Sequence, residues 1–514
     1  MFGHAVNTHI ALVFLPLMFS AWFSVTGNSV QAAEHLAANP AQLSVALNTA
    51  VPGDRIVMAD GIWLDQKIVF KSHGTVEQPI TLCAQTPGKV ILTGESGLQI
   101  GGTHLVVEGL CFKGNPNGPG LSAVVFRVSR DEVASHCRLT QCAIIDYSPP
   151  EKSVGTSYVV LYGKHNRVDH CLFRGKTNRS AMLVVNFDPG SPPNHHRIDH
   201  NHFADRPPQG FNGAEVIQVG WSAAQQVDSR TIVEFNYFEE CNGEVEIITN
   251  KSCENIYRHN TFVRCQGALS LRVGHRCTVE GNFFLGHHLP QTGGVHVFGE
   301  EHRIINNYFE GLTGTKEELG VPYGEGAAVV LMNGSGLVFA GDPRVLQYPT
   351  GGILHPQVKR TLVAFNTFVD CRALVDIGLA FAPFDAVSHL APSDCVIANN
   401  LALGKSNSRL LIFSSEPLNL VSQGNLAWHD SASPVPSQGF LIRDLKLSRD
   451  PAGIMRPSPD SPAIGAAVGA FAVTYDIDGQ LRPERHPDAG CDQTGNEPGT
   501  RRPLTALDVG PDWR

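Results

Sequence analysis

The sequence is poor in charged residues, which make up only 17% of its 514 residues and leave a net charge of −9. This composition excludes a surface built as a whole to hold nucleic acid or another polyanion, so we expect no nucleic-acid partner. An acidic ligand would need a local cationic groove or a bound metal ion instead. The chain also has no phosphate-binding glycine loop and no Ser-His-Asp arrangement with supporting context.

Long apolar runs are missing after residue 33, which argues against a membrane-spanning helix in the rest of the chain. The one early run, IALVFLPLMFSAWFSV at residues 10–25, is short for a membrane span, and small residues follow it at Ala32 and Ala33. These features are typical of a signal peptide, although no lysine or arginine precedes Glu34. We therefore predict a signal peptide over residues 1–33 and a secreted or periplasmic protein without a membrane partner.

Helical periodicity is nearly absent, and no C-x-x-C pair occurs among the twelve cysteines. Only PAQLSVALNTA, residues 40–50, could form a short amphipathic helix, which would cap the N-terminal end of the fold. Cys241, Cys253, Cys265 and Cys277 recur at intervals of 12 residues. This recurrence favours small buried thiols over disulfides, even in an exported protein.

The sequence does contain a repeat of asparagine, any residue and an apolar residue, as in NHF, NYF and NTF. The repeat begins at Asn201, Asn236, Asn260, Asn282, Asn307, Asn366, Asn400 and Asn425. The shorter intervals are 22 to 25 residues, and the intervals of 34, 35 and 59 residues suit a coil with an insertion or a skipped coil. Short runs rich in β-branched residues lie between the markers and predict strands of about five residues.

Strands that recur at a small fixed period without crossover helices predict a parallel β-helix, in which each coil stacks on the next. Stacked asparagine amides would then hydrogen-bond from coil to coil. We expect an all-β fold, a single-stranded parallel β-helix over residues 34–493, with coils mainly to about residue 430 and a C-terminal cap after them. Residues 494–514 are predicted to form a polar tail.

Three basic residues stand at similar distances before these markers. Lys251, Arg272 and His296 precede the next marker asparagine by 9, 10 and 11 residues. Because coils stack at about the inter-strand spacing of 4.8 Å, the three side chains are predicted to form a column on one face. His275 and Tyr257 lie near this column and are candidates, together with His296, for contacts with a substrate, although ordinary solenoid roles stay open for both.

Acidic residues lie beside the predicted column. Glu244 and Glu246 alternate on one strand and therefore share a face, and the preceding coil offers Asn212 and Glu215 in FNGAEVIQVG. Three carboxylates and an amide oxygen are hard ligands of the kind that calcium prefers, and the carboxylates would repel one another without a cation or protons between them. The pattern predicts a calcium site, and a solvated acidic face is the alternative.

A calcium ion beside a lysine and an arginine suits the cleavage of a polysaccharide that contains uronic acids. The ion would neutralise the uronate carboxylate and stabilise the charge that develops as the C5 proton leaves. Lys251 would remove this proton in its uncharged form, which the positive charges of calcium and Arg272 favour. Arg272 would protonate the departing C4 oxygen or stabilise it with a hydrogen bond. The product would carry a C4–C5 double bond, so no hydrolytic water is needed.

The segments NGEVEIITNKSCENIYRHNTF, GALSLRVGHRCTVEGNFFLG and GGVHVFGEEHRIINNYFEGL resemble polysaccharide lyase family 6, which includes alginate lyases and the dermatan sulfate lyase chondroitinase B. The likeness extends from PGDRIVMADGIW to about residue 430. It implies a right-handed parallel β-helix and calcium-dependent catalysis, with Lys251 as the base and Arg272 as the acid. The family's calcium ligands would fall on Asn212, Glu244 and Glu246, with Glu215 less firmly assigned.

Two positions depart from the family pattern. Many members carry histidine after the catalytic arginine, and arginine in the segment matching GGVHVFG, where this chain has Val273 and His296. Losing an arginine removes a bidentate clamp for a carboxylate or sulfate group. Because the chain shows no run of extra basic residues that would bind sulfates, we predict alginate as the substrate, with dermatan sulfate as the alternative.

Two other classes of protein stay open at this stage. A β-helix glycoside hydrolase would need two acidic groups placed as acid and as base or nucleophile. A non-catalytic solenoid would bind a polysaccharide without shortening it. The positions of Lys251 and Arg272 beside the acidic cluster favour the lyase.

Overall fold

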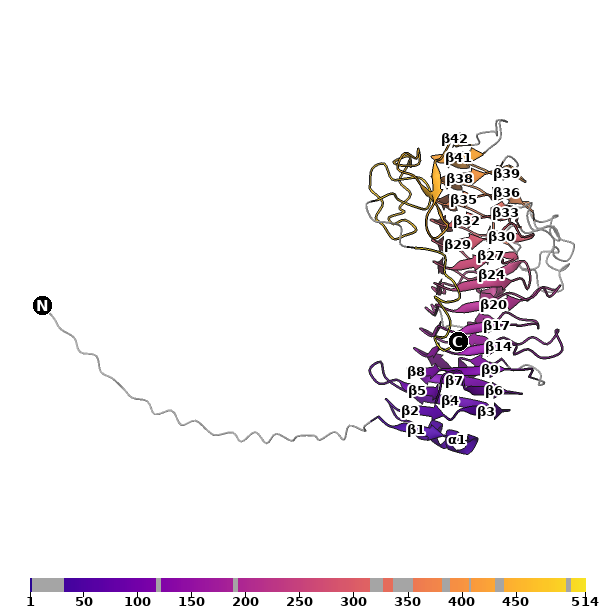
Figure 1. Ribbon diagram of the computed structural model, residues 1–514, viewed down its shortest axis with the longest axis vertical. Helices are drawn as coiled ribbons and strands as arrows, with labels where there is room; N and C mark the ends of the chain where they lie inside the picture. Colours follow the sequence, from indigo (N-terminus) through magenta and orange to yellow (C-terminus); the bar gives the residue numbers. More distant parts are fainter. Residues whose placement is uncertain are drawn as a thin grey trace.

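The computed structural model of the protein describes Met1 and residues 32–116, 122–187, 193–314, 327–335, 355–380, 389–405, 408–429, 439–495 and 501–514. The predicted signal peptide, residues 1–33, lies almost entirely outside these residues. Three long sheets, which we name A, B and C in the order in which each coil visits them, run the length of the molecule (Figure 1). They confirm the predicted parallel β-helix.

Sheet A is parallel throughout, and each of its strands pairs with the strand of the next coil. In order it holds β1 (Glu34–Ala37), β2 (Arg55–Met58), β5 (Ile80–Ala84), β8 (Leu105–Glu108), β13 (Arg138–Thr140), β16 (Arg167–Asp169), β19 (Arg197–Asp199), β22 (Ile232–Glu234), β25 (Ile256–Arg258), β28 (Thr278–Glu280), β31 (Arg303–Ile305), β34 (Leu362–Ala364), β37 (Val396–Ala398) and β40 (Val421–Gln423).

Sheet B is also parallel and reaches one coil further than the predicted limit near residue 430. In order it holds β3 (Gly61–Leu64), β6 (Val90–Thr93), β9 (Leu110–Lys113), β14 (Ala143–Ile145), β17 (Leu172–Arg174), β20 (His202–Arg206), β23 (Tyr237–Cys241), β26 (Thr261–Val263), β29 (Phe283–Leu285), β32 (Tyr308–Glu310), β35 (Thr367–Val369), β38 (Leu401–Gly404), β41 (Asn425–His429) and β42 (Phe440–Ile442).

Sheet C carries the longest strands of the middle coils and, as shown below, the candidate site. In order it holds β11 (Arg127–Ser129), β12 (Glu132–Ser135), β7 (Gly97–Thr103), β10 (Val124–Val125), β15 (Val159–Leu161), β18 (Leu183–Val185), β21 (Ile217–Gly220), β24 (Glu246–Lys251), β27 (Gly267–Val273), β30 (Thr292–Val297), β33 (Ala327–Met332), β36 (Ala373–Leu379) and β39 (Arg409–Phe413), with β4 (Lys67–His73) paired to β7.

Two short helices interrupt the strands. Helix α1 (Pro40–Thr49) forms where the sequence predicts it and lies across the N-terminal end of the coils (Figure 1). The side chain of Asn39 accepts a hydrogen bond from the Gln42 N–H and so caps the helix start, where proline at the first position also suits the fold. The second helix is the 3₁₀ turn η1 (Ser222–Ala224), which follows β21.

The marker asparagines form a continuous ladder between sheets A and B. Each side-chain oxygen accepts hydrogen bonds from the backbone N–H and the side-chain amide of the preceding marker, at 2.9 to 3.0 Å. Because each amide satisfies buried groups of two coils, the spacing of asparagine in the sequence follows the coil length. The predicted amide stack is confirmed.

Rings and thiols pack inside the same coils. Phenylalanines two residues after the markers stack with ring centroids 4.6 to 4.9 Å apart. All twelve cysteines are buried free thiols, which confirms the prediction made for the four that recur from Cys241 to Cys277. Cys241 lies beside Cys265 of the next coil, and Cys253 lies beside Cys277, so the interval of 12 residues marks two corners of one coil.

Breaking the ladder should destabilise the protein strongly. Asn282 accepts from Asn260 and donates to the Tyr257 carbonyl, so replacing Asn282 with alanine leaves several buried groups without partners. We expect a loss of about 2–4 kcal/mol in the free energy of unfolding. The midpoint of thermal unfolding measures it, with Asn48→Ala on the exposed face of α1 as the control, and equal midpoints for the two variants would contradict the ladder's role.

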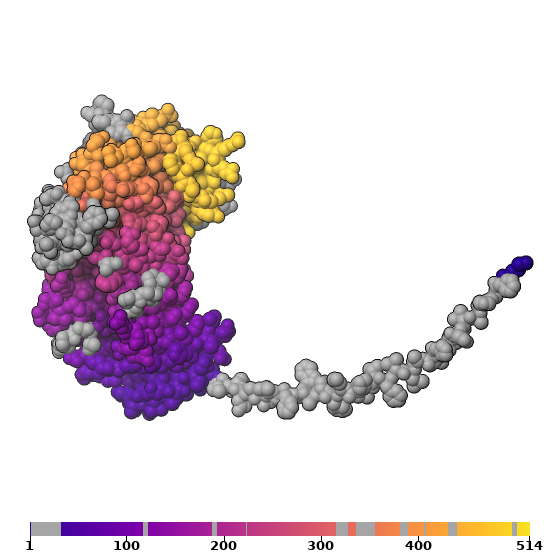
Figure 2. All heavy atoms as spheres, turned by 180° about the vertical axis from the view of Figure 1, so that it is seen from behind, coloured from indigo at the N-terminus to yellow at the C-terminus, as the bar shows by residue number. Residues whose placement is uncertain are grey.

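The C-terminal cap lies along one side of the coils and not over their end (Figures 1 and 2). It begins with an antiparallel hairpin of β43 (Leu447–Arg449) and β44 (Met455–Pro457). Further on, the Asn306 side chain donates to the Tyr475 carbonyl at 2.7 Å, and the Cys491 N–H donates to Thr367 Oγ1 at 3.0 Å. The described residues of the cap therefore contact sheets A and B of the later coils.

The last residues, which are predicted to form a polar tail, do not extend freely from the cap. Residues 501–514 run back along the solenoid toward its N-terminal coils (Figure 1). The Leu504 N–H donates to Thr261 Oγ1 at 2.9 Å, and the Trp513 Nε1 donates to the Gln141 carbonyl at 2.7 Å. Composition alone could not show this docking, because the apolar contacts of this segment come from a few residues spaced along a polar stretch.

Candidate active site

Three glutamates meet at the corner between sheets B and C. Glu215, Glu244 and Glu246 each offer a carboxylate oxygen, and these oxygens lie within 4.8 Å of one another. All three side chains are buried. Glu246 opens β24, whereas Glu215 comes from the preceding coil, shortly before β21. The structure thus brings together the three carboxylates that the sequence singles out.

The donor set of this carboxylate triad (Glu215, Glu244 and Glu246) fits a hard divalent cation. Buried carboxylates this close repel one another when ionised, and calcium takes carboxylate, carbonyl and amide oxygens. The triad could therefore bind calcium. Asn212, the fourth predicted ligand, is exposed in the loop directly before Gly213, and its part in cation binding stays a prediction.

Backbone groups hold Glu244 in place. Its Oε1 accepts hydrogen bonds from the N–H groups of Gly213 at 3.2 Å and Ala214 at 3.0 Å, which belong to the loop that carries Glu215. Gly267 of the next coil has a φ of +101°, and a Cβ there would lie 2.7 Å from the Glu244 carbonyl oxygen. Glycine at this position lets the neighbouring coil approach the triad closely.

Lys251 and Arg272 lie in neighbouring coils of sheet C. Asn250 pairs with Leu271 and Lys251 pairs with Val273, so Arg272 is the extra residue of a β-bulge. From inside the coil, the Asn250 side-chain amide donates to the Val273 carbonyl at 2.9 Å. This buried bond joins the ends of the two strands that carry Lys251 and Arg272.

Arg272 contacts the triad and lies in the coil next to that of Lys251. Its Nη1 donates to Glu246 Oε1 at 3.2 Å. Burial acts to raise the pKa of Glu246, but the positive charges of Arg272 and Lys251 outweigh it and lower that pKa below its usual value. Glu246 is therefore an ionised carboxylate at neutral pH, although it is buried.

His296 lies on the same sheet but not in line with Arg272. It pairs with Ser270 of β27, which in turn pairs with Thr249 of β24. The predicted straight column is thus wrong at His296, which pairs two residues before Lys251 and Arg272. The counts to the markers already contain the offset from Lys251, and the bulge adds one residue to the offset from Arg272. Burial lowers the pKa of His296 to about 4, with Glu246 opposing and Arg272 reinforcing the shift, so its ring is uncharged at neutral pH.

His355 also belongs to this surface, and no sequence pattern predicts it. Its ring stacks on Phe298 with centroids 4.2 Å apart. Burial and the nearby charges of Arg272 and Lys251 hold its pKa well below the usual value. His355 falls in the 59-residue interval between two markers, where the repeat offers no measure of phase.

The other two predicted substrate contacts are not placed to serve as such. Tyr257 is 0% exposed and points into the core, where its hydroxyl donates to Asn250 Oδ1 at 2.7 Å, so the prediction that it contacts sugar is wrong. His275 has both ring nitrogens engaged, Nε2 with the Gln226 side chain and Nδ1 with the Glu300 N–H. A sugar could bind to His275 only by displacing one of them.

Removing the Tyr257 hydroxyl tests this correction. Tyr257→Phe takes one of two hydrogen bonds from Asn250 Oδ1, which still accepts from Asn255 at 2.7 Å, so we expect a loss of about 1 kcal/mol in stability. The KM for a polysaccharide substrate should stay unchanged. A clearly raised KM with an unchanged unfolding midpoint would restore Tyr257 as a substrate contact.

A second acidic group lies in the cap and differs from the triad in its charge balance. Asp476, Asp478 and Asp492 also offer oxygens within 4.8 Å of one another. Arg456 lies between them, with Nη1 at 2.5 Å from Asp478 and 2.7 Å from Asp492. An arginine thus serves as the resident counter-charge, and we assign this group to the structure of the cap.

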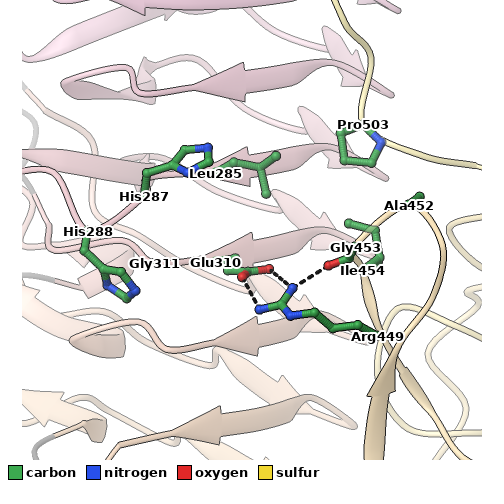
Figure 3. A pocket seen from close by; sticks show the side chains of 10 residues that line it. All are labelled: Leu285, His287, His288, Glu310, Gly311, Arg449, Ala452, Gly453, Ile454 and Pro503. Atoms are coloured by element: carbon green, nitrogen blue, oxygen red, sulfur yellow. Dashed lines mark hydrogen bonds and ion pairs between the residues drawn. The ribbon is translucent and has the colours of Figure 1, made fainter.

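A pocket of about 280 Å³ opens between sheet B and the cap (Figure 3). His287 and His288 lie on one side, and Pro503 lies on the other. The Arg449 guanidinium at its edge forms two bonds to the Glu310 carboxylate, at 2.5 and 3.2 Å. None of the predicted site residues lines this pocket, so the chemistry belongs to sheet C and not to the pocket.

Comparison with known families agrees with this site. A model of the chondroitinase B family matches residues 37–465. The chain belongs to the chondroitinase B family. The comparison with curated proteins found no match to this chain.

Among the residues that the structure describes, no helix is both long and apolar enough to cross a membrane.

Solved structures similar to this chondroitinase B family member include polysaccharide lyases. A mutant of AlyGC, a PL6 family alginate lyase, is 33% identical with a TM-score of 0.78, over 94% of this chain and 59% of that one. A mannuronic acid specific family 6 lyase from human gut microbiota is 29% identical with a TM-score of 0.70, over 80% of this chain and 91% of that one. The PL6 family polysaccharide lyase Pedsa3628 from Pseudopedobacter saltans is 25% identical, with a TM-score of 0.69, over 93% and 99%. This chain spans less than two thirds of the length of AlyGC.

Proposed function

We propose that the protein is a calcium-dependent lyase that cleaves alginate by β-elimination. The observation that carries the proposal is the meeting of a buried carboxylate triad with Lys251 and Arg272 on one face of sheet C. A glycoside hydrolase needs no such lysine, and a binding surface needs no buried like charges. The membership of the chondroitinase B family supports the same reaction class.

Lys251 is proposed to take the C5 proton of the uronate ring. It is partly exposed at the end of β24, whereas the groups around it are buried, so its amine can meet a sugar at the surface. As the C5–H bond breaks, the electron pair forms the C4–C5 double bond and the C4–O bond to the neighbouring sugar breaks. Arg272, fixed in the bulge one coil away, protonates the departing oxygen, which ends as a hydroxyl, and then regains a proton from solvent.

The triad would hold the calcium ion, with Asn212 as a further ligand. A bound calcium ion would neutralise the substrate carboxylate and stabilise negative charge at C5. Glu246 also accepts from Arg272, which keeps the guanidinium beside the place where the substrate carboxylate would lie. His296 and His355 are proposed to line the groove as uncharged rings, so they can bind sugar hydroxyls without a fixed charge.

Alginate is proposed over dermatan sulfate on two grounds. Two of the similar structures are alginate or mannuronic acid lyases at 33% and 29% identity. In addition, the resemblance places His296 and Val273 where many family members carry an arginine and a histidine, so these two positions supply no arginine clamp for a sulfate group. Dermatan sulfate remains the alternative substrate, since the matching family model bears the name of chondroitinase B.

The direct test is the absorbance of the unsaturated product. Purified protein with calcium is incubated with polymannuronate, polyguluronate, mixed alginate and dermatan sulfate, and the ultraviolet absorbance of the unsaturated product is followed. Growth of the signal on alginate supports the proposal, and growth on dermatan sulfate alone would select the alternative. New reducing ends without absorbance would indicate a hydrolase, and retention on the polymer without cleavage would indicate a binding protein.

Export is part of the proposal, since the polymeric substrate lies outside the cell. The apolar segment at residues 10–25 and the small residues Ala32 and Ala33 support a signal peptide. The mass of the protein recovered from a periplasmic or culture fraction tests this. A start after residue 33 is expected, and an uncleaved chain confined to the cytoplasm would contradict it.

A further inference from the structure

We infer that Arg206 is a positioning residue of the triad: it ties together the two loops that carry Glu215 and Glu244, and so keeps the carboxylates assembled for a divalent cation. This inference rests on the proposed function, because it assigns a role in calcium binding. It adds a residue that lies behind the site, in the interior of the coil, and that contacts neither substrate nor cation.

Arg206 is a buried arginine without a carboxylate partner in hydrogen-bond contact among the described residues. It ends β20 and is 0% exposed. Its guanidinium donates instead to backbone carbonyls from two coils. The bonds are Nη1 to Lys176 at 2.7 Å and to Asn178 at 3.0 Å, Nη2 to Ser180 at 3.1 Å, and Nε to Ala214 at 3.0 Å. A fork of donors this fully used fixes the loops that it contacts.

One of these bonds leads directly to the triad. Ala214 gives its carbonyl to Arg206 and its N–H to Glu244, and Glu215 is the next residue. The peptide group of Ala214 is thus held from both sides. Gly243, the residue before Glu244, packs against the same arginine, because a Cβ there would lie 2.2 Å from the Ala214 oxygen and 2.9 Å from Arg206 Cγ. Arg206 therefore contacts both loops that bring acidic ligands to the corner.

The charges agree with this geometry. Burial lowers the pKa of Arg206 to about 10, and the phenol of Tyr158 and the carboxylates of Glu215 and Glu244 act against the shift. The arginine is therefore charged at neutral pH, and two carboxylates of the triad lie near enough to favour that charge. A buried charge without such compensation would cost several kcal/mol. Arg206 and the triad stabilise each other through the protein interior, from the side opposite the one that a cation would approach.

Lys176 fixes the loop whose carbonyl groups accept hydrogen bonds from Arg206. Its amine is 0% exposed and donates to the Asn178 carbonyl at 2.9 Å, the Asn178 side-chain oxygen at 2.6 Å and the Arg179 carbonyl at 2.9 Å. It thereby orders the turn whose carbonyls accept from Arg206. The loops around the triad are thus fixed by backbone contacts to two buried basic side chains, and not by the carboxylates alone.

Arg206→Lys separates this role from a general contribution to stability. Lysine keeps the charge but cannot reach four carbonyls, so the Ala214 peptide loses its anchor. Calorimetry with Ca²⁺ alone should show a dissociation constant raised about 10- to 100-fold, as for groups that orient metal ligands from behind. Activity on alginate should fall at low calcium and return at saturating calcium, with KM for the polymer unchanged.

Arg482→Lys is the matched control. Arg482 is also buried and donates to the backbone carbonyls of Asp488 and Gly490, but it lies in the cap. This variant should lower the unfolding midpoint without moving the calcium dissociation constant. If Arg206→Lys lowers the midpoint to the same degree and leaves calcium affinity within about twofold of the wild type, the inference is overturned and Arg206 is only structural.

Gly243→Ala provides a second variant in case Arg206→Lys does not fold. Its methyl group would displace the Ala214 carbonyl from the other side, so calcium affinity should fall in the same direction. An affinity equal to that of the wild type would count against the inference. Wild-type protein that binds no Ca²⁺ would instead overturn the proposed metal site and the inference with it, and the two failures are therefore distinguishable.

Discussion

Replacing Lys251 with alanine is expected to lower the turnover of alginate by about 1,000-fold, within the range typical for the loss of a general base. Lys251 is partly exposed at the end of β24, so its amine can reach a sugar at the surface. Without this amine, no strong base remains at the place proposed for the C5 proton among the described residues of the site. KM should change little, since Arg272 and the triad remain.

The matched control for this variant is Lys164→Ala. Lys164 lies at the same junction, between sheets C and A, in an earlier coil, away from the triad. Both variants should unfold at the wild-type midpoint and bind Ca²⁺ as the wild type does. Turnover of the Lys251 variant within tenfold of the wild type would show that another group removes the proton.

Removing one negative charge from the triad should have the second largest effect. Glu244→Gln keeps an oxygen for the N–H groups of Gly213 and Ala214, so the loop should stay in place, but the carboxylate charge is lost. Even groups that only orient metal ligands change metal affinity by about 10- to 100-fold, so we expect affinity for Ca²⁺ to fall by more than about 100-fold. Activity at ordinary calcium concentrations should fall in parallel.

Calcium removal gives the same result by a different route. A chelator should abolish the wild-type activity reversibly, and added Ca²⁺ should raise the unfolding midpoint of the wild type, because a ligand that binds only the folded state stabilises it. The Glu244 variant should show little such shift. Glu132→Gln, a partly exposed change on β12 of the same sheet, serves as control and should behave as the wild type. Full activity in the chelator would refute a role for the cation.

The architecture could be predicted from the sequence because one side chain repeats for a single physical reason. Each marker asparagine must satisfy buried groups of its own coil and of the next, so any coil that breaks the spacing loses hydrogen bonds. The same regularity places Lys251 and Arg272 on neighbouring coils. The three glutamates could be grouped because like charges at alternate positions of an apolar strand need a shared partner.

What could not be predicted depends on local departures from the repeat. The bulge at Arg272 adds one residue to the offset between Arg272 and His296, and a count to the next marker does not reveal a bulge. Tyr257 is close to the site in sequence, but the strand turns its ring inward. His355 comes from a segment without a marker, and Arg206 follows the marker Asn201 in a coil with no other sign of the site, so only packing in three dimensions shows that they adjoin Arg272 or the triad.

The docked C-terminal segment has a consequence for how the molecule comes apart. Rungs of a solenoid touch only their neighbours, so such arrays commonly fray inward from an end. Here Trp513 bonds to Gln141 across 372 residues of chain, which ties an early rung to residues 501–514. Fraying that reaches this rung must open the contact, so we expect the rungs along the docked segment to melt together. The contact can close only after residue 513 has been synthesised, which makes it a late step in assembly.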